Sequence, residues 1–300
     1  MAVDIITSEN PYVLDYLLGD KKRPALTRKN ADFIEAIVRL DSNYAKDSYI
    51  TNPDAGYDPE INAESSNGKY CGSTAYWIDE MKKPNCNFRK CVLGAVIAID
   101  SANSTHLEAA VSGRKTMRDI ICNKCNNYLD LIDILNTPFE PTNHNHLIAL
   151  LTNKTISKKD GKVRFNISFA TKFCAYASIF LNSKIQYSKY DNVVSDALPY
   201  YSEIYLNEHK DLKEYKINDN QRRKLDEEGN FQYRLNVYSD YQKTINRIIE
   251  KLKSDGINLT IEEFNHIVWY GLKWNKEKLI LESWLMHNKI KKQMLFGKLY

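Results

Sequence analysis

Lys172 lies in the stretch SFATKFCAYASIFLNSKIQYSKYD, residues 168–191, with apolar side chains around it. Phe169, Ala175 and Tyr176 stand three or four residues away and share its helical face. Such a lysine has two interpretations. Its stem packs on the apolar surface while the ammonium group reaches solvent. Alternatively, burial lowers the pKa of the amine, which then attacks an electrophilic carbon and forms a Schiff base.

Asp191 follows 19 residues later and also has two interpretations. With Ser188 it fits a capping box, in which Ser188 is the N-cap and Asp191 the third helical residue. The same position places a carboxylate at the positive end of a helix dipole, where it stays ionised. An ionised carboxylate beside a nucleophilic lysine stabilises a cation that develops on a substrate. Both interpretations stay open at this point.

A basic stretch, residues 153–164, directly precedes this pair. It contains one acid, Asp160, against five cationic residues: Lys154, Lys158, Lys159, Lys162 and Arg164. A run of charges is commonly a solvated loop. Because it leads into the helix of Lys172, it also fits a set of phosphate contacts beside a site.

The segments SFATKFCAYA and IQYSKYDNVV resemble the helix-hairpin-helix DNA glycosylases, nearest to the 8-oxoguanine DNA glycosylase branch. That family has a hairpin, then a catalytic lysine early in a helix, then a catalytic aspartate at the start of the next helix. The two glycines usual in the hairpin are replaced here by Ser168 and Ala170. The later segment FNHIVWYGLKW, residues 264–274, is similar to a C-terminal helix of small members of that branch. The resemblance covers about residues 140–285.

The resemblance implies a DNA glycosylase with AP-lyase activity that acts in base-excision DNA repair. Lys172 and Asp191 are then the catalytic residues, and double-stranded DNA with an extruded base is the partner. Candidates for stacking on the extruded base are Tyr176, Phe173 and Trp269, although each aromatic also fits a core position. Ser168 joins the basic residues as a phosphate contact.

Other functions remain open beside this one. The enzyme could be directed at modified bases in phage DNA, as a defence, rather than at an oxidised purine. The chain could be a non-catalytic helix-hairpin-helix module in which Lys172 only contacts phosphate. It could also be an α-helical interaction protein in which the spacing of lysine and aspartate is accidental.

Cysteines and histidines give weaker signals. Cys122 and Cys125 have the spacing of a zinc knuckle, and Cys86 and Cys91 could complete four ligands, but their separation is irregular and free thiols are favoured. His144 and His146 could face one metal, yet without a third ligand nearby we expect a surface turn. No glycine-rich phosphate loop occurs, and no four-cysteine cluster follows the region of resemblance, so the iron–sulfur branch of the superfamily is disfavoured. We expect no metal and no cofactor.

The fold class expected is mostly α, a helical bundle of the helix-hairpin-helix glycosylase kind with a catalytic groove. The two-proline segment TPFEPTNHN, 137–145, marks a boundary between an N-terminal helical region of unassigned role, 1–140, and the catalytic region, 141–300. Helical patterns occur at 30–48, 74–81, 92–102, 107–127, 129–135, 146–151, 169–181, 189–203, 261–272 and 276–294, with a long amphipathic helix through 241–252 that ends before Gly256.

The whole chain has 300 residues and a formal net charge of +4, a mild basic bias compatible with a polyanionic partner. The N-terminus lacks a basic segment followed by an apolar block, and the most apolar run, Cys91–Ile99, is about half of what a bilayer requires. We therefore expect a cytoplasmic protein without a membrane partner, and a monomer.

Overall fold

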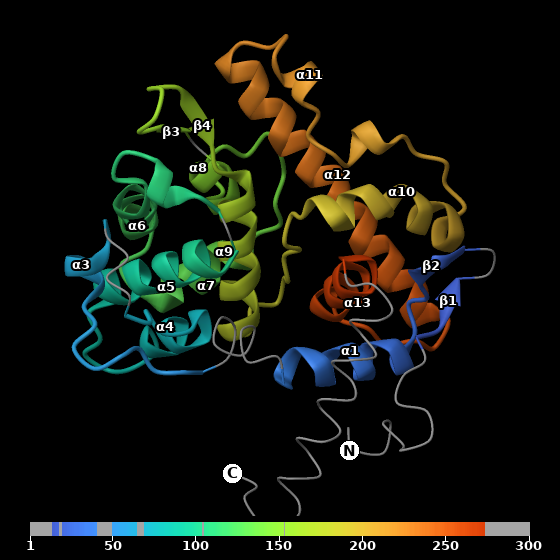
Figure 1. The fold of residues 1–300 in the computed structure, drawn as a ribbon, viewed down its shortest axis with the longest axis horizontal. Coiled ribbons are helices and arrows are strands. Elements are labelled where there is room, and N and C mark those ends of the chain that lie inside the picture. Colours follow the sequence, from blue (N-terminus) through green and yellow to red (C-terminus); the bar gives the residue numbers. More distant parts are fainter. Residues whose placement is uncertain are drawn as a thin grey trace, which may run out of the picture. The chain divides into compact units, whose positions relative to one another are not determined.

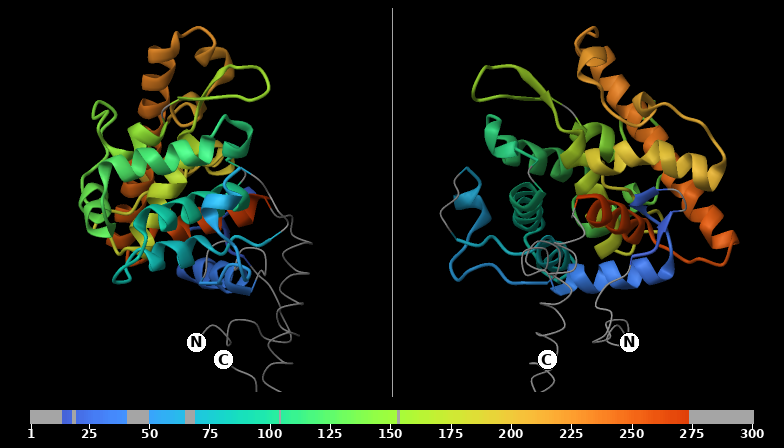
Figure 2. Two further views of the ribbon diagram at one scale, coloured as in Figure 1. Left: turned by 90° about the vertical axis from the view of Figure 1, so that its left-hand side faces the viewer. Right: turned by 45° about the vertical axis from the view of Figure 1, so that its right-hand side comes forward.

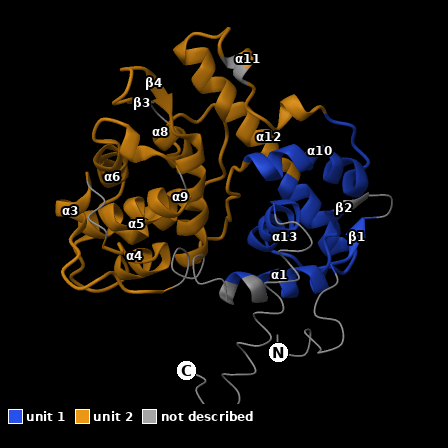
Figure 3. Cartoon of the chain, viewed as in Figure 1, with its two compact units in different colours: residues 1–42, 192–210, 245–300 blue, residues 43–191, 211–244 orange. Residues whose placement is uncertain are grey.

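The structure is a computed structural model, and it describes residues 14–17, 20–40, 50–64, 69–103, 105–152 and 154–273. Helices dominate these residues, with two short antiparallel strand pairs, so the expected mostly α class is confirmed (Figure 1). The chain divides into two compact units, which Figure 3 colours separately. Unit 1 comprises residues 1–42, 192–210 and 245–300, and unit 2 comprises 43–191 and 211–244. The boundary predicted between residues 140 and 141 lies inside unit 2.

Unit 1 is built on α1 (Arg28–Leu40), α10 (Asn192–Leu206) and α13 (Ile261–Lys273), with the strand pair β1 (Tyr16–Leu17) and β2 (Asp20–Pro24). α13 packs against both α1 and α10. Its start has the predicted capping box: Thr260 N–H donates to Glu263 Oε2 at 2.8 Å, and Glu263 N–H donates to Thr260 Oγ1 at 3.1 Å. The predicted helix 276–294 lies outside the described residues.

Unit 2 contains the helices α3 (Pro59–Asn62), α4 (Thr74–Glu80), α5 (Phe88–Asn103), α6 (Gly113–Lys124), α7 (Tyr128–Leu135), α8 (Leu147–Thr152), α9 (Ile167–Phe180) and α11 (Asp219–Arg222), and the 3-10 turns η2 (Leu107–Ala109) and η3 (Leu212–Glu214). It also contains the strands β3 (Lys154–Ile156) and β4 (Val163–Phe165). The long helix α12 (Glu227–Ser254) runs through the unit division at residue 245.

α5 forms the centre of unit 2 because it is apolar around its whole circumference. Residues 91–100 are all buried, and α3, α4, α6 and α9 pack against the helix. Trp77 of α4 lies flat over Gly94, where a Cβ would come within 2.2 Å of the indole. Gly94 is therefore needed for the close approach of α4 to α5, a requirement that its helical position alone does not reveal.

Two local predictions differ from the structure: the helix start at Ser188 and the character of the basic stretch. The capping box at Ser188 is wrong, since α10 begins only at Asn192 and Asp191 directly precedes it. Ser188 is instead fully buried, and its N–H donates to Gln242 Oε1 at 2.6 Å. The basic stretch is only partly a loop: residues 157–162 connect the strands β3 and β4, which form a hairpin between α8 and α9. By contrast, the end of α12 is confirmed, because Gly256 has a φ of +84° just beyond it.

Candidate functional site

Lys172 lies in the second turn of α9 and is half-buried. Its Nζ donates to the backbone carbonyl of Asn103, the last residue of α5, at 3.1 Å. The last carbonyls of a helix have no intrahelical donor, so they are free to accept such a hydrogen bond from a side chain. The lysine head is therefore held against the end of a buried helix rather than dispersed in solvent.

Tyr176 lies one helical turn after Lys172 and contacts the same asparagine. Its hydroxyl donates to Asn103 Oδ1 at 3.4 Å, and only 1% of the residue is exposed. Asn103 Nδ2 is buried and has no hydrogen-bond partner in the structure. Lys172 and Tyr176 thus converge on Asn103, which keeps one unused donor beside them.

The ring of Tyr176 is already occupied on its faces. Phe180 stacks on it with ring centroids 6.1 Å apart and an interplanar angle of 1°, and Lys189 Nζ lies 4.0 Å from the ring centroid. A cation over an aromatic face is attracted by the ring quadrupole. A base that stacks on Tyr176 must therefore displace Lys189, and the tyrosine is better placed to orient its neighbours than to form an open platform.

Asp191 immediately precedes the first residue of α10. The backbone before it is attached to α9, because Tyr190 N–H donates to Thr171 Oγ1 at 3.1 Å. Burial and the Asp191 carboxylate raise the pKa of the Tyr241 phenol well above its ordinary value. The Tyr241 hydroxyl donates to Lys189 O at 2.9 Å. Tyr241 therefore contacts the backbone of Lys189 and is also close enough to Asp191 to be affected by its charge.

Thr171 organises this junction, and sequence reasoning missed it. It is fully buried, and its hydroxyl donates to Ile167 O at 2.9 Å while it accepts from Tyr190. Thr171 and Tyr190 are 19 residues apart, as are Lys172 and Asp191, because each stands one position before a member of that pair. This common spacing was visible in the sequence. Asn103 and Lys189 carry no comparable sequence signal. The packing of α5 against α9 brings Asn103 to the site, and the hydrogen bond between Tyr190 and Thr171 brings Lys189 there.

The other two aromatic candidates are Phe173 of α9 and Trp269 of α13. Phe173 is a core residue with 0% exposure that packs against Phe169, with ring centroids 6.1 Å apart. It offers no surface on which a base can stack, so its assignment to the substrate surface is corrected here. Trp269 belongs to α13 of unit 1 and is half-buried, with Lys273 Nζ 4.2 Å from its ring centroid. Its stacking role stays a prediction.

The basic residues lie on the β3–β4 hairpin, and two of them are anchored to the chain near η2. Lys158 Nζ donates to Glu108 O at 2.9 Å, and Arg164 Nη1 donates to His106 O at 3.3 Å. Lys159 is exposed, and the Lys162 side chain is 80% exposed beside Asp160. Lys154 is a residue of β3. The hairpin thus offers cationic groups to solvent from a fixed backbone.

Ser168 does not occupy a hairpin. Ser168 and Ala170, the positions that match the family's hairpin glycines, are both inside α9, so this expectation is wrong. Their amides are therefore part of a helix rather than a phosphate-binding turn, although Ser168 remains half-buried in its first turn. Phosphate contacts near Lys172 are then a matter for the cationic side chains of the β3–β4 hairpin.

The six cysteines are free thiols. Burial raises the pKa of Cys91 and of Cys125 to about 12, and it raises those of Cys122 and Cys174 as well. Neutral thiols are poor nucleophiles and poor metal ligands. Within the described ranges, no group of three or more metal-ligating side chains is assembled.

The surface turn expected at His144 and His146 is wrong for His146. This residue is 2% exposed, and its Nε2 lies 3.1 Å from both Thr137 O and Tyr187 Oη. Its Nδ1 accepts from Ile148 N–H at 3.2 Å. Burial lowers the pKa of His146 to about 4. His144 is exposed and contacts Gln232 at 2.8 Å.

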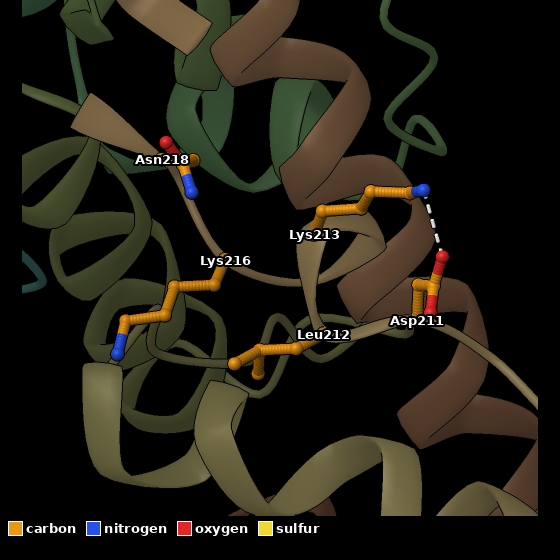
Figure 4. A pocket seen from close by; sticks show the side chains of 5 residues that line it. All are labelled: Asp211, Leu212, Lys213, Lys216 and Asn218. Carbon is orange, nitrogen blue, oxygen red and sulfur yellow. Dashed lines mark ion pairs between the residues drawn. The ribbon is translucent and has the colours of Figure 1, made fainter. Parts of the chain in front are cut away.

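A shallow surface pocket lies in unit 2, away from Lys172 in the sequence. It is lined by Asp211, Leu212, Lys213, Lys216 and Asn218 (Figure 4). Asp211 and Lys213 pair across 2.7 Å at its rim, where both side chains are largely exposed. An exposed ion pair of this kind is weak and exchanges readily with water, so the pocket has no buried polar group that would define a ligand.

No protein-family model, curated protein or solved structure matches this chain. Within the part of the chain that the structure describes, no helix combines the length and the apolar character needed to cross a bilayer.

Proposed function

We propose that this chain is a DNA glycosylase with associated AP-lyase activity, which excises a damaged or modified base through a Schiff base on Lys172. One observation carries the proposal. The Lys172 amine is held at the end of α5, and the segment that ends in Asp191 is attached through Tyr190 and Thr171 to the same turn of α9. The hydrogen bond between Tyr190 and Thr171 joins the residue before the proposed nucleophile to the residue before the proposed carboxylate, which supports the proposal.

Lys172 supplies the chemistry of the covalent step. Once the target nucleotide is extruded, the unprotonated amine attacks C1′ of the sugar while the bond from C1′ to the base breaks and the base leaves with a proton. The C1′–O4′ bond then breaks, O4′ takes a proton from water to become a hydroxyl group, and C1′ is held as an iminium ion on Nζ. Loss of a proton from C2′ then expels the 3′ phosphate, which nicks the strand by β-elimination. The hydrogen bond to Asn103 O defines where the amine starts.

Asp191 supplies the electrostatic part. Breaking the glycosidic bond builds positive charge on the sugar, and a nearby carboxylate stabilises that charge in the transition state. Asp191 directly precedes the first residue of α10, so its carboxylate belongs to the start of that helix.

The β3–β4 hairpin supports the DNA part of the proposal, because its lysines face solvent immediately before α9. The target could be an oxidised purine of the genome or a modified base of phage DNA. Borohydride trapping over a panel of duplexes with oxidised, alkylated and phage-type bases tests the proposal. A covalent adduct with one class identifies the substrate, and no adduct with any of them contradicts the proposal.

A second candidate, a non-catalytic DNA-binding module, is favoured by one specific observation. The Lys172 head is occupied by the Asn103 carbonyl, and the ring faces of Tyr176 are covered. In that function the hairpin lysines bind phosphate and no covalent chemistry follows. A chain that binds duplexes with a steep salt dependence and forms no adduct fits this candidate.

A further inference from the structure

The chain that follows α9 returns along that helix toward Asp191. Tyr187 N–H donates to Ser178 Oγ at 3.3 Å, and Tyr190 N–H donates to Thr171 Oγ1 at 3.1 Å, nearer the start of the helix. Residues 187–190 therefore run antiparallel to α9, a course that can be followed in Figure 2. We call these four residues the return segment. Its last residue directly precedes Asp191.

α12 also holds the backbone of the return segment. Ser188 N–H donates to Gln242 Oε1 at 2.6 Å, and Ser188 O accepts from the Tyr238 hydroxyl at 3.0 Å. The Tyr241 hydroxyl donates to Lys189 O at 2.9 Å. Gln242 is 7% exposed, and both tyrosines are fully buried. Breaking any of these bonds would leave a buried polar group unpaired, so the backbone around Lys189 is held in one position.

Lys189 is the one residue of the return segment whose side chain is not buried. Tyr187, Ser188 and Tyr190 are buried, whereas Lys189 is half-buried. Its Nζ lies 4.0 Å from the centroid of the Tyr176 ring, an attractive arrangement for a cation and an aromatic face. The bound backbone and the ring together define where this ammonium group lies.

Tyr176 connects Lys189 to the proposed nucleophile. It stands one helical turn after Lys172 on α9, so the two side chains share a face of the helix. Lys172 Nζ and the Tyr176 hydroxyl both donate to Asn103, at 3.1 Å and 3.4 Å. The Lys189 ammonium group therefore lies beside the same tyrosine as the Lys172 amine, and two residues before Asp191.

The proposed reaction creates charge on both sides of the bond that breaks. Asp191 is assigned to the positive charge on the sugar, while the electron pair of the glycosidic bond goes to the base. That developing negative charge is stabilised by a cation or by a proton donor placed in advance. A lysine ammonium group is both.

We propose that Lys189 is the catalytic acid for the departing base. This inference rests on the proposed function and deepens it. As the bond from C1′ to the base breaks, its electron pair stays on the base and Lys189 Nζ transfers a proton to the base. The lone pair of Lys172 forms the new bond to C1′. The Lys172 nitrogen then loses a proton to water, and Lys189 regains one from water.

This role selects the substrate by its charge. A neutral base leaves as an anion unless it takes up a proton, so its removal depends on the acid. A base that already carries a positive charge through N-alkylation leaves as a neutral molecule without an acid, and the ammonium group repels it. The substrate class is therefore a neutral modified base with a poor leaving nitrogen.

The test compares wild-type and Lys189→Gln protein on duplexes that contain a series of neutral 8-substituted guanines or the cationic base 7-methylguanine. Lys189→Gln should slow removal of the neutral bases by about a hundredfold, as expected for loss of a general acid. Removal of 7-methylguanine should fall by less than about threefold. Within the neutral series, the rate should depend more steeply on the acidity of the leaving nitrogen, a change that loss of stability alone does not produce.

Two controls isolate the acid. A preformed abasic site has no base to protonate, so Lys189→Gln should nick it within about threefold of the wild-type rate. Lys184→Gln removes an exposed lysine between α9 and α10 and should leave the preference between neutral and cationic bases unaltered. An unchanged dependence on the leaving nitrogen in Lys189→Gln overturns the inference, as does an equal slowing of all substrates, the abasic site included.

The proposed function is judged separately by borohydride trapping with Lys189 intact. Trapping by the wild type together with unaltered selectivity of Lys189→Gln overturns the acid alone. A wild-type chain that removes no base overturns both.

Discussion

Tyr190 donates its backbone N–H to the hydroxyl oxygen of Thr171 at 3.1 Å, across a sequence separation of 19 residues. Each partner is the residue immediately before a proposed catalytic group, Asp191 and Lys172. The bond is buried, so water cannot replace it without cost. It therefore sets the register between α9 and the segment leading into α10, and with it the spacing of the two functional groups along the joined backbone.

Thr171→Val keeps the shape of this side chain but removes the acceptor of Tyr190 N–H. An unpaired buried donor costs about 1–3 kcal/mol, so we expect the free energy of unfolding to fall by that amount. Urea unfolding measures it. Thr116→Val, whose hydroxyl bonds to Ser112 O on a half-buried surface, is the control and should change the free energy by less than about 0.5 kcal/mol. Equal losses in both variants would contradict a special role for Thr171.

Lys172→Gln should abolish strand nicking and the borohydride-reduced adduct, because a glutamine amide cannot form an iminium ion. Affinity for DNA should stay within about threefold, since the phosphate contacts are assigned to the hairpin. Lys184→Gln, an exposed lysine of the same unit, is the control for loss of one charge. Nicking at the wild-type rate by the Lys172 variant would show that another residue is the nucleophile.

Asp191→Asn separates the two chemical steps. It should slow base removal by about a hundredfold or more, because the carboxylate acts mainly in the transition state, and it should change DNA affinity little. Nicking of a preformed abasic site should be much less affected, since the glycosidic bond is already broken there. Asp133→Asn on the exposed side of α7 is the control. If both substrates slow equally, the residue acts on the lyase step or on folding instead.

Sequence patterns predicted the local features that depend on neighbours in the chain. The pattern at 92–102 predicted a helix where α5 lies, and Thr260 with Glu263 predicted the start of α13, since both signals are complete within a few residues. Lys172 in a helix with apolar neighbours was likewise predictable. These features need no knowledge of what packs from elsewhere.

Features that depend on distant partners could not be predicted in the same way. Ser188 has the residue type of an N-cap, but its N–H is bound by Gln242 from α12, and the helix starts later. The strands β3 and β4 are only three residues long, and the lysines between Ile156 and Val163 dominate the pattern of this stretch. The hairpin was therefore missed. His146 was predicted to lie in a surface turn because no third metal ligand stands near it in the sequence. Its buried partner Tyr187 is 41 residues away, so no sign of this contact was visible in the sequence.

His146 predicts a loss of stability in mild acid. Its pKa is about 4 in the folded protein and 6.5 in an ordinary environment, so the unfolded chain binds more protons between these values. Stability from this group is thus present above pH 6.5 and is lost as the pH falls toward 4. The free energy of unfolding should drop by about 2 kcal/mol from pH 7 to pH 5 through this residue.

Urea unfolding at both pH values measures the effect, and two histidine variants assign it. His146→Gln should remove most of this pH dependence, because no proton binds to the amide. His144→Gln, at an exposed position two residues earlier, should retain it. The same pH dependence in the wild type and in the His146 variant would mean that other groups account for it.

The hairpin lysines predict how DNA binding depends on salt. Lys159→Glu together with Lys162→Glu should weaken binding to all duplexes alike, because phosphate contacts carry no sequence information. The slope of log affinity against log salt should become shallower by about two, one for each lost contact. Fluorescence anisotropy from 50 to 200 mM salt measures it. Lys124→Glu with Lys184→Glu makes the same charge change on α6 and after α9, and should leave the slope nearly unchanged. A loss confined to lesion-bearing DNA would instead show that the hairpin reads the base.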